Sequence, residues 1–217
     1  MGKLKGHLLT DIRAVVVDWG GVLTLPPSPD VLARMHSLVG LDADTFGAVW
    51  FRHRRAYDLG QVDATEYWRR VGVEAQRAFD ASTLRTLREL DAACFEVPNP
   101  AMVAWLGALK SADRRLALLS NTPHEQWIAL QHTLTWLPLL DTVVLSCDLS
   151  IAKPDPQIYA YCLERLGIAP SEALFVDDRE DNVEAARRLG MHALAYTTTE
   201  TLRARVRELC GPRFPLP

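Results

Sequence analysis

Short apolar runs rich in β-branched residues alternate along most of the chain with segments whose apolar residues recur every three to four positions. The short runs are expected to be strands, and they lie at residues 12–18, 115–121, 141–147, 172–178 and 192–196. The other segments are expected to be helices, at residues 100–111, 123–136, 155–167, 179–190 and 202–211. Because strands that alternate with helices form right-handed βαβ units, the pattern predicts an α/β fold around a buried parallel sheet.

Residues 29–96 follow a different pattern, with no convincing strand and several helical stretches. These stretches lie at residues 29–40, 43–60, 63–72 and 82–95, and glycines close several of them. The segment "TLPPSPD" separates them from the first strand, since its prolines cannot continue a regular element. We therefore predict a core made of residues 1–24 and 98–217 and an inserted helical bundle made of residues 25–97.

The composition is that of an ordinary globular protein. Hydrophobic residues make up 48% of the 217 positions, which supports a well-filled interior. The 24 Lys and Arg residues face 27 Asp and Glu residues, for a formal net charge of −3, so the chain lacks the basic footprint of nucleic-acid binding and of membrane attachment. We expect a small-molecule partner instead, with the chain acting as a monomer or a homodimer.

Location and thiol chemistry are constrained only weakly by the sequence. No apolar run approaches the length of a membrane span, and the first residues lack the pattern of a secretory signal, so a cytoplasmic location is expected. The cysteines form neither a CxxC pair nor a zinc-ligand spacing, which predicts four reduced thiols without a role in chemistry: Cys94, Cys147, Cys162 and Cys210.

Polar residues stand where several predicted strands end. Asp18 closes the first strand, Ser120 and Asn121 close the second, and Asp177 and Asp178 close the fourth. In doubly wound sheets, ligands bind at the carboxyl ends of the parallel strands. The sequence therefore predicts that these side chains meet at one edge of the sheet, joined by Lys153 from the loop "AKPDP".

Three carboxylates at one site would repel one another strongly in a low-dielectric environment, so the site needs cations. Lys153 supplies one positive charge, and an all-oxygen ligand set suits Mg²⁺, which takes one or two carboxylates together with phosphate oxygens. Ser120 and the backbone amides after Asp18 are then available to phosphate oxygens. Gly20 and Gly21 let the backbone turn sharply and approach a ligand closely.

Four segments, in this order, resemble the motifs of the haloacid dehalogenase (HAD) superfamily of hydrolases: "VVVDWGGVLT", "LALLSN", "AKPDPQIY" and "LFVDDREDNVEAARRLG". The resemblance spans nearly the whole chain, and the motifs are most similar to a branch that contains α-glucose-1-phosphate phosphatases. It implies a Rossmann-like three-layer core with a parallel sheet. It also implies that the inserted helices form a type 1 cap over the site.

The resemblance implies a role for each matching residue. Asp18 would be the nucleophile that becomes an aspartyl-phosphate, while Ser120 and Lys153 would bind the transferring phosphoryl group. Mg²⁺ would be held by Asp18, Asp178 and the backbone carbonyl of Gly20. The resemblance also implies substrate-binding residues, which are Trp19, Gly20, Gly21 and Asn121. Asp177 and Asn182 would be supporting residues beside the metal.

One position departs from the family pattern. Most phosphatases of the family carry a second Asp two residues after the nucleophile, and this chain has Gly20 there. That Asp is a general acid and base, a role worth about 10²- to 10⁴-fold in rate. A good leaving group, such as an anomeric sugar oxygen, would need less protonation. Alternatively, water or a residue of the segment His53, Arg54, Arg55, Tyr57 and Asp58 would carry the proton, although its "RHRR" run is more typical of a solvated helix face.

Two other functions fit Gly20. In a 2-haloacid dehalogenase the leaving halide needs no proton, but the dehalogenases of this family work without a metal and differ from this chain at Asp177 and Asp178. A protein that binds a phosphoryl ligand without catalysis would also lack the acid. We predict a Mg²⁺-dependent phosphatase for a small phosphomonoester, with sugar phosphates as the first candidates.

Overall fold

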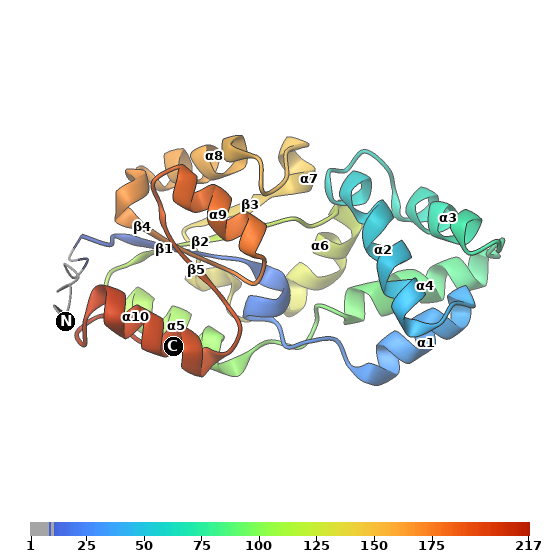
Figure 1. The fold of residues 1–217 in the computed structure, drawn as a ribbon, viewed down its shortest axis with the longest axis horizontal. Coiled ribbons are helices and arrows are strands. Elements are labelled where there is room, and N and C mark those ends of the chain that lie inside the picture. The colour runs from blue at the N-terminus through green and yellow to red at the C-terminus, as the bar shows by residue number, and fades with distance from the viewer. Residues whose placement is uncertain (1–8, 10) are drawn as a thin grey trace, which may run out of the picture.

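The sheet of the described part of the chain, residues 9 and 11–217 of a computed structural model, contains five strands. All neighbouring strands are parallel, in the order β3-β2-β1-β4-β5 (Figure 1). Their bounds are β1 Ala14–Val17, β2 Arg115–Ser120, β3 Thr142–Leu145, β4 Ala173–Asp177 and β5 His192–Ala195. The predicted α/β fold with a parallel sheet is confirmed, and each strand lies within its predicted range.

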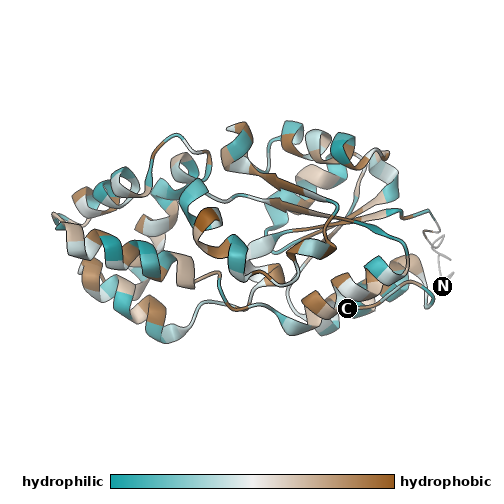
Figure 2. Ribbon diagram, turned by 180° about the vertical axis from the view of Figure 1, so that it is seen from behind, coloured by the Kyte–Doolittle hydropathy of each residue, from teal (hydrophilic) through white to brown (hydrophobic). Residues whose placement is uncertain are grey.

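Helices cover both faces of the sheet, which gives three layers. Alternate residues of the strands point to opposite faces, so Val15 and Val17 belong to one cluster of buried residues and Ala14 and Val16 to another. The first cluster includes side chains of α5 (Pro100–Ser111) and α10 (Thr199–Cys210). The second includes side chains of α8 (Pro156–Leu166) and α9 (Glu180–Arg188). Figure 2 shows the hydrophobic strands between these helices.

Four helices lie beyond one end of the sheet (Figure 1) and form a third apolar cluster of their own. They are α1 Pro29–Val39, α2 Ala43–Asp58, α3 Ala64–Glu74 and α4 Ala81–Ala93. The side chains of Asp42, Asp63 and Asp80 cap α2, α3 and α4 by accepting bonds from backbone N–H groups. An isolated bridge between Thr24 and Pro98 lies at the predicted boundary between core and cap, which stays a prediction.

The segment predicted as one helix over residues 123–136 is shorter in the structure. Helix α6 covers His124–Leu130 and is followed by 3-10 turns at Gln131–Thr133 and Leu137–Leu139. The Thr133 hydroxyl donates to the Leu130 carbonyl at 2.8 Å and competes with the helical backbone bond. The prediction of a continuous helix was therefore wrong at its C-terminal half. The strand predicted over 141–147 also ends early, because Ser146–Leu149 forms the short helix α7.

No helix among the described residues is long and apolar enough to cross a membrane.

Candidate active site

A buried lysine links two of the strand-end carboxylates. Lys153 lies in the loop between α7 and α8, and its Nζ is 2.7 Å from Asp18 Oδ1 and 2.6 Å from Asp177 Oδ2. The side chains of Lys153 and Asp177 are almost completely buried, and that of Asp18 is 11% exposed. Because β1 and β4 are neighbours in the sheet, their carboxyl ends present both carboxylates to the same ammonium group.

The carboxylates destabilise one another's charge. Burial raises the pKa of Asp18 to about 7, with Asp177 and Asp178 adding to the rise and Lys153 opposing it. Burial also raises the pKa of Asp178, and the charge of Asp177 adds to that effect. Burial acts against the charged form of Lys153, but Asp177 and Asp18 together raise its pKa. The site therefore has more negative charge than one ammonium group offsets.

This excess charge fits a divalent cation. Asp18, Asp177 and Asp178 each offer a carboxylate oxygen within 4.8 Å of the others. Hard oxygen donors of this kind suit Mg²⁺ better than a softer metal. A buried acceptor, Asn182 Oδ1, also lies without a hydrogen-bond partner among the residues that the structure describes. The residues present therefore fit Mg²⁺, which Asp18 and Asp178 would hold.

Asp177 is largely occupied by protein groups. Its Oδ1 accepts from the Arg179 backbone N–H at 2.9 Å, and the Asn182 amide donates to both of its oxygens at 2.9 and 3.1 Å. With the Lys153 ion pair, these contacts fix the carboxylate on the ammonium group. Asp177 and Asn182 thus hold each other and the ammonium group in place, and the supporting role expected for both stays a prediction.

Asn121 and Ser120 are held in place by neighbours. The Asn121 amide donates to the Lys153 carbonyl at 2.9 Å and accepts from the Lys153 backbone N–H at 2.8 Å, so it anchors the lysine loop. Substrate contact by Asn121 stays a prediction. Ser120 Oγ is 2.7 Å from the hydroxyl of Thr122, a buried residue that the sequence analysis did not single out. Thr122 could have been found from the sequence, because its hydroxyl follows Ser120 by two positions in "SNTP" at the end of the same strand.

The two glycines after Asp18 are required for different reasons. Gly21 has a φ of +71°, and a Cβ there would lie 2.7 Å from Asp178 Oδ2, so both backbone conformation and space exclude a side chain. Gly20 has an ordinary φ of −64°. A Cβ on Gly20 would lie 2.9 Å from the Phe95 ring, which fills the space next to it. The ring of Phe95 thus stands where a side chain at position 20 would begin.

A cavity of about 1040 Å³ lies between the sheet edge and the cap, where helix α2 and Phe95 line it. Trp19 lines the cavity from the core side. The other core residues of the lining are those described above: Asp18, Gly20, Gly21, Ser120, Asn121, Lys153, Asp178 and Asn182. The cap contributes aromatic and charged side chains: Trp50, Phe51, Arg52, Arg54, Arg55, Asp58 and Phe95. The lining thus includes every predicted core site residue except the wholly buried Asp177, but it lacks His53 and Tyr57 among the candidate proton carriers of the cap.

Arg54 of α2 is the centre of a buried polar cluster in the cap. Its Nε is 2.8 Å from Asp58 Oδ1, its Nη1 is 2.7 Å from Asp91 Oδ1, and its Nη2 donates to Gln126. The guanidinium carbon also lies 5.5 Å from the ring centroids of Tyr57 and Phe95. Burial opposes its charge, but Asp91 and Asp58 raise the pKa of Arg54 well above its ordinary range.

The expectation of a solvated "RHRR" face was wrong for Arg54, although Arg52 and Arg55 are exposed. His53 turns away from the site, and its Nε2 lies 2.7 Å from Glu74. Helical spacing explains the difference, since positions 54 and 58 are four residues apart and share the face of α2 that meets the core.

The family model described as haloacid dehalogenase-like hydrolase matches residues 12–190. A solved HAD family enzyme from Bacteroides thetaiotaomicron, in complex with magnesium and inorganic phosphate, has the same fold with a TM-score of 0.70. The two chains are 20% identical, and the match covers 86% of this chain and 94% of the other.

Three curated relatives differ in the activity that their names state. Acyl-CoA dehydrogenase family member 10 of Mus musculus is 30% identical over 94% of this chain, which spans only 19% of that protein. Sesquiterpene phosphatase astK of Aspergillus oryzae is 25% identical over 94% of this chain and 100% of its own length. (S)-2-haloacid dehalogenase 4A of Burkholderia cepacia is 25% identical over 86% of this chain and 84% of its own.

Proposed function

This chain belongs to the haloacid dehalogenase-like hydrolases, and we propose that it is a Mg²⁺-dependent phosphatase that cleaves a small phosphomonoester through an aspartyl-phosphate on Asp18. The observation that carries the proposal is the close approach of Asp18 and Asp178, whose carboxylate oxygens lie within 4.8 Å of each other and of Asp177. Such a group of carboxylates needs a cation beyond Lys153. In a phosphatase, that cation would offset the negative charge of the phosphoryl group. The name of one relative that matches over its full length also states phosphatase activity.

The proposed reaction has two steps. A carboxylate oxygen of Asp18 attacks phosphorus, and the bond from phosphorus to the ester oxygen breaks as the new bond forms. The Lys153 ammonium and the Ser120 hydroxyl would hold the equatorial oxygens, while Mg²⁺ on Asp18, Asp178 and the Gly20 carbonyl would supply further positive charge. Water then cleaves the acyl-phosphate, which releases inorganic phosphate and restores the carboxylate. Catalysis of this kind depends mostly on positioning and electrostatics.

Removal of the metal is the test of this function. We expect turnover of p-nitrophenyl phosphate with Mg²⁺, loss of turnover in EDTA, and recovery when Mg²⁺ is restored in excess, because the carboxylates cannot bind a phosphate dianion without added positive charge. Phosphate release is the measurement. Hydrolysis that continues unchanged in EDTA after dialysis would contradict the proposal.

Dehalogenation is the second candidate, since Gly20 offers no acid and a curated relative is a haloacid dehalogenase. A panel of 2-haloacids assayed in EDTA distinguishes the two reactions. Halide release without metal, in the absence of phosphate release, would favour dehalogenation. If the protein binds one equivalent of beryllium fluoride but turns over none of the phosphate esters tested, it binds phosphoryl ligands without catalysis.

The apolar part of the cavity lining constrains the leaving group. This part contains Trp19, Trp50, Phe51 and Phe95, together with Pro26 and Pro27. A substrate with an apolar face fits this part of the lining, as a sugar ring or a hydrocarbon chain would. The substrate panel should therefore pair sugar 1-phosphates with alkyl and prenyl phosphates.

Asp58 is our candidate for the proton donor that Gly20 cannot supply. It lines the same cavity as Asp18, and burial raises the pKa of Asp58 to about 6 while Arg54 opposes the rise. Asp58→Asn is expected to lower kcat for alkyl phosphates by about 10²-fold or more but to change p-nitrophenyl phosphate turnover little, because p-nitrophenolate leaves without a proton. The pH profile adds a check, since loss of the Asp58 proton should give the wild-type rate with alkyl phosphates a limb that falls as pH rises, and Asp58→Asn should remove that limb.

Asp91→Asn is the matched control for Asp58→Asn. Asp91 bonds the same guanidinium group but does not line this cavity. If Asp58 acts only by holding Arg54, both variants will slow all substrates alike, and the assignment of the proton donor fails.

Gly20→Asp tests whether the missing acid can be restored. The new Cβ would lie 2.9 Å from the Phe95 ring, so we expect overpacking that costs about 1–3 kcal/mol in the free energy of unfolding and lowers turnover. Adding Phe95→Ala to Gly20→Asp should recover turnover relative to the single variant, with Phe95→Ala alone as the control. A gain in hydrolysis from Gly20→Asp alone would instead indicate a binding protein that had lost its acid.

A further inference from the structure

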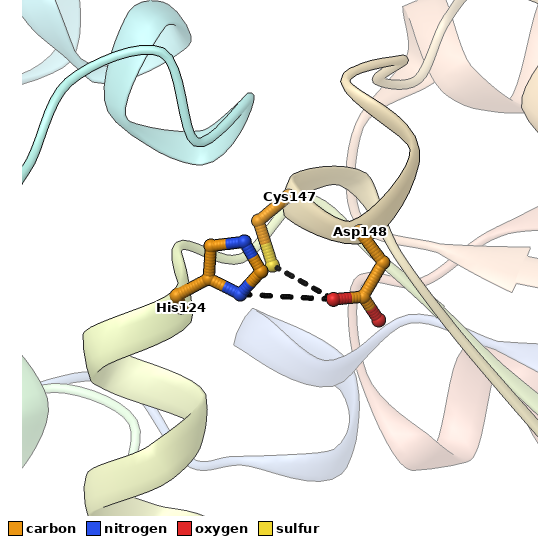
Figure 3. A group of neighbouring side chains, drawn as sticks. All are labelled: His124, Cys147 and Asp148. Atoms are coloured by element: carbon orange, nitrogen blue, oxygen red, sulfur yellow. Dashed lines mark hydrogen bonds and ion pairs between the residues drawn. The ribbon is translucent and has the colours of Figure 1, made fainter.

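Three side chains of the kinds that bind metals lie together outside the cavity described above (Figure 3). They are His124 at the start of α6 and Cys147 and Asp148 of α7. His124 Nδ1 is 3.6 Å from Asp148 Oδ1, and Cys147 Sγ is 3.8 Å from the same oxygen. All three donor atoms lie within 4.8 Å of one another, and none of the three residues lines the cavity described above.

The fold brings these residues together although the sequence spacing does not suggest it. Strands β2 and β3 are neighbours, and α6 and α7 follow them at the same edge of the sheet. The Thr122 backbone N–H donates to Ser146 Oγ at 3.0 Å, which ties the two helix starts together. On the cap side, the turn after α2 lies beside the His124 ring, since a Cβ added to Gly60 would be 3.4 Å from it.

The donor atoms of His124, Cys147 and Asp148 are spaced as ligands of one metal ion would be, and their contacts without a metal are an ion pair and a weak thiol hydrogen bond. A separation of 3.6 Å is too long for a hydrogen bond between the imidazole and the carboxylate. It is close to the separation of about 3.4 Å expected between a nitrogen and an oxygen ligand on a tetrahedral Zn²⁺ ion. Cys147 is only 5% exposed, yet its sulfur faces two solvent-exposed donors, as Figure 3 shows.

We propose that His124 Nδ1, Cys147 Sγ and an Asp148 carboxylate oxygen bind one Zn²⁺ ion, with water as the fourth ligand. One nitrogen, one sulfur and one oxygen ligand form a borderline-soft set that prefers Zn²⁺ to Mg²⁺, in contrast to the all-oxygen group at Asp18. On binding, the Cys147 thiol loses its proton to solvent as the sulfur–zinc bond forms. The ion would fix the start of α6 to α7 beside the cap turn at Gly60. This assignment revises the expectation that Cys147 has no chemical role.

Cobalt is the probe for this site, because thiolate bound to Co²⁺ gives a charge-transfer absorption that oxygen ligands do not. The intact protein, reduced and saturated with Mg²⁺, is titrated with Co²⁺ and then with Zn²⁺. We expect one equivalent of Co²⁺ to produce the thiolate band together with the visible bands of tetrahedral cobalt, and Zn²⁺ to remove both. The readout needs no enzymatic activity, so it stands or fails independently of the proposed phosphatase.

Single substitutions assign the ligands. Cys147→Ser should abolish the thiolate band, and His124→Gln, at an exposed position that tolerates change, should weaken Co²⁺ binding about tenfold or more. The controls are Cys210→Ser and His132→Gln, which alter a thiol and an imidazole elsewhere and should leave the titration unchanged. Absence of the thiolate band in the unaltered protein, or its persistence in Cys147→Ser, would overturn the proposal.

Discussion

Asp18→Asn is expected to lower phosphatase turnover by about 10⁴-fold or more, because an amide oxygen is a poor nucleophile and the aspartyl-phosphate cannot form. The substitution keeps the shape of the side chain at the end of β1. It also removes one negative charge from a site where burial and two neighbouring carboxylates disfavour that charge. The loss of activity should therefore occur without loss of the fold, and the midpoint of urea unfolding should stay the same or rise.

The measurement is the initial rate of phosphate release by the two proteins at saturating Mg²⁺, with unfolding followed on the same samples. Asp44→Asn is the matched control, since Asp44 is exposed on α2 and away from the carboxylate cluster. A variant at position 18 that keeps a tenth of the wild-type rate would show that another group attacks phosphorus.

Lys153→Met is expected to abolish turnover and also to destabilise the protein. The ammonium group lies 2.7 Å from Asp18 and 2.6 Å from Asp177, and its side chain is 1% exposed. Removing one partner of a buried ion pair leaves uncompensated charge and costs about 3–5 kcal/mol. We expect the free energy of unfolding to fall by that amount at neutral pH in EDTA, with partial recovery on addition of Mg²⁺.

Two comparisons separate the structural and catalytic roles of Lys153. Lys110→Met breaks a surface pair with Asp141 and should cost less than about 1 kcal/mol. The double variant Lys153→Met, Asp177→Asn removes one of the two stranded charges, so it should regain stability without regaining turnover. If Lys153→Met costs no more than Lys110→Met, the buried ion pair is not what organises this edge of the sheet.

The sheet and its polar edge could be predicted because both depend on local pattern. Buried parallel strands are nearly continuous apolar runs, and a charged residue directly after such a run needs a partner or a function. Asp18 and Asp177 follow this rule, and Lys153 is placed beside them by the short loop before α8.

The cap side of the site could not be predicted in the same way. Arg54 lies within a run of charges that resembles a solvated face, and its burial depends on Asp91 and Gln126, which come from distant helices. The position of Phe95 next to Gly20 likewise results from packing between segments about 75 residues apart in sequence, which no local pattern encodes. His124 and Cys147 were missed for the same reason.

The most direct test of the account is a structure of the protein with Mg²⁺ and beryllium fluoride, which mimics a phosphoryl group on a carboxylate. The account predicts beryllium bonded to the Asp18 carboxylate, Mg²⁺ between Asp18 and Asp178, and the Lys153 ammonium on a fluoride. Beryllium fluoride bound elsewhere, or Mg²⁺ that does not touch both Asp18 and Asp178, would contradict it.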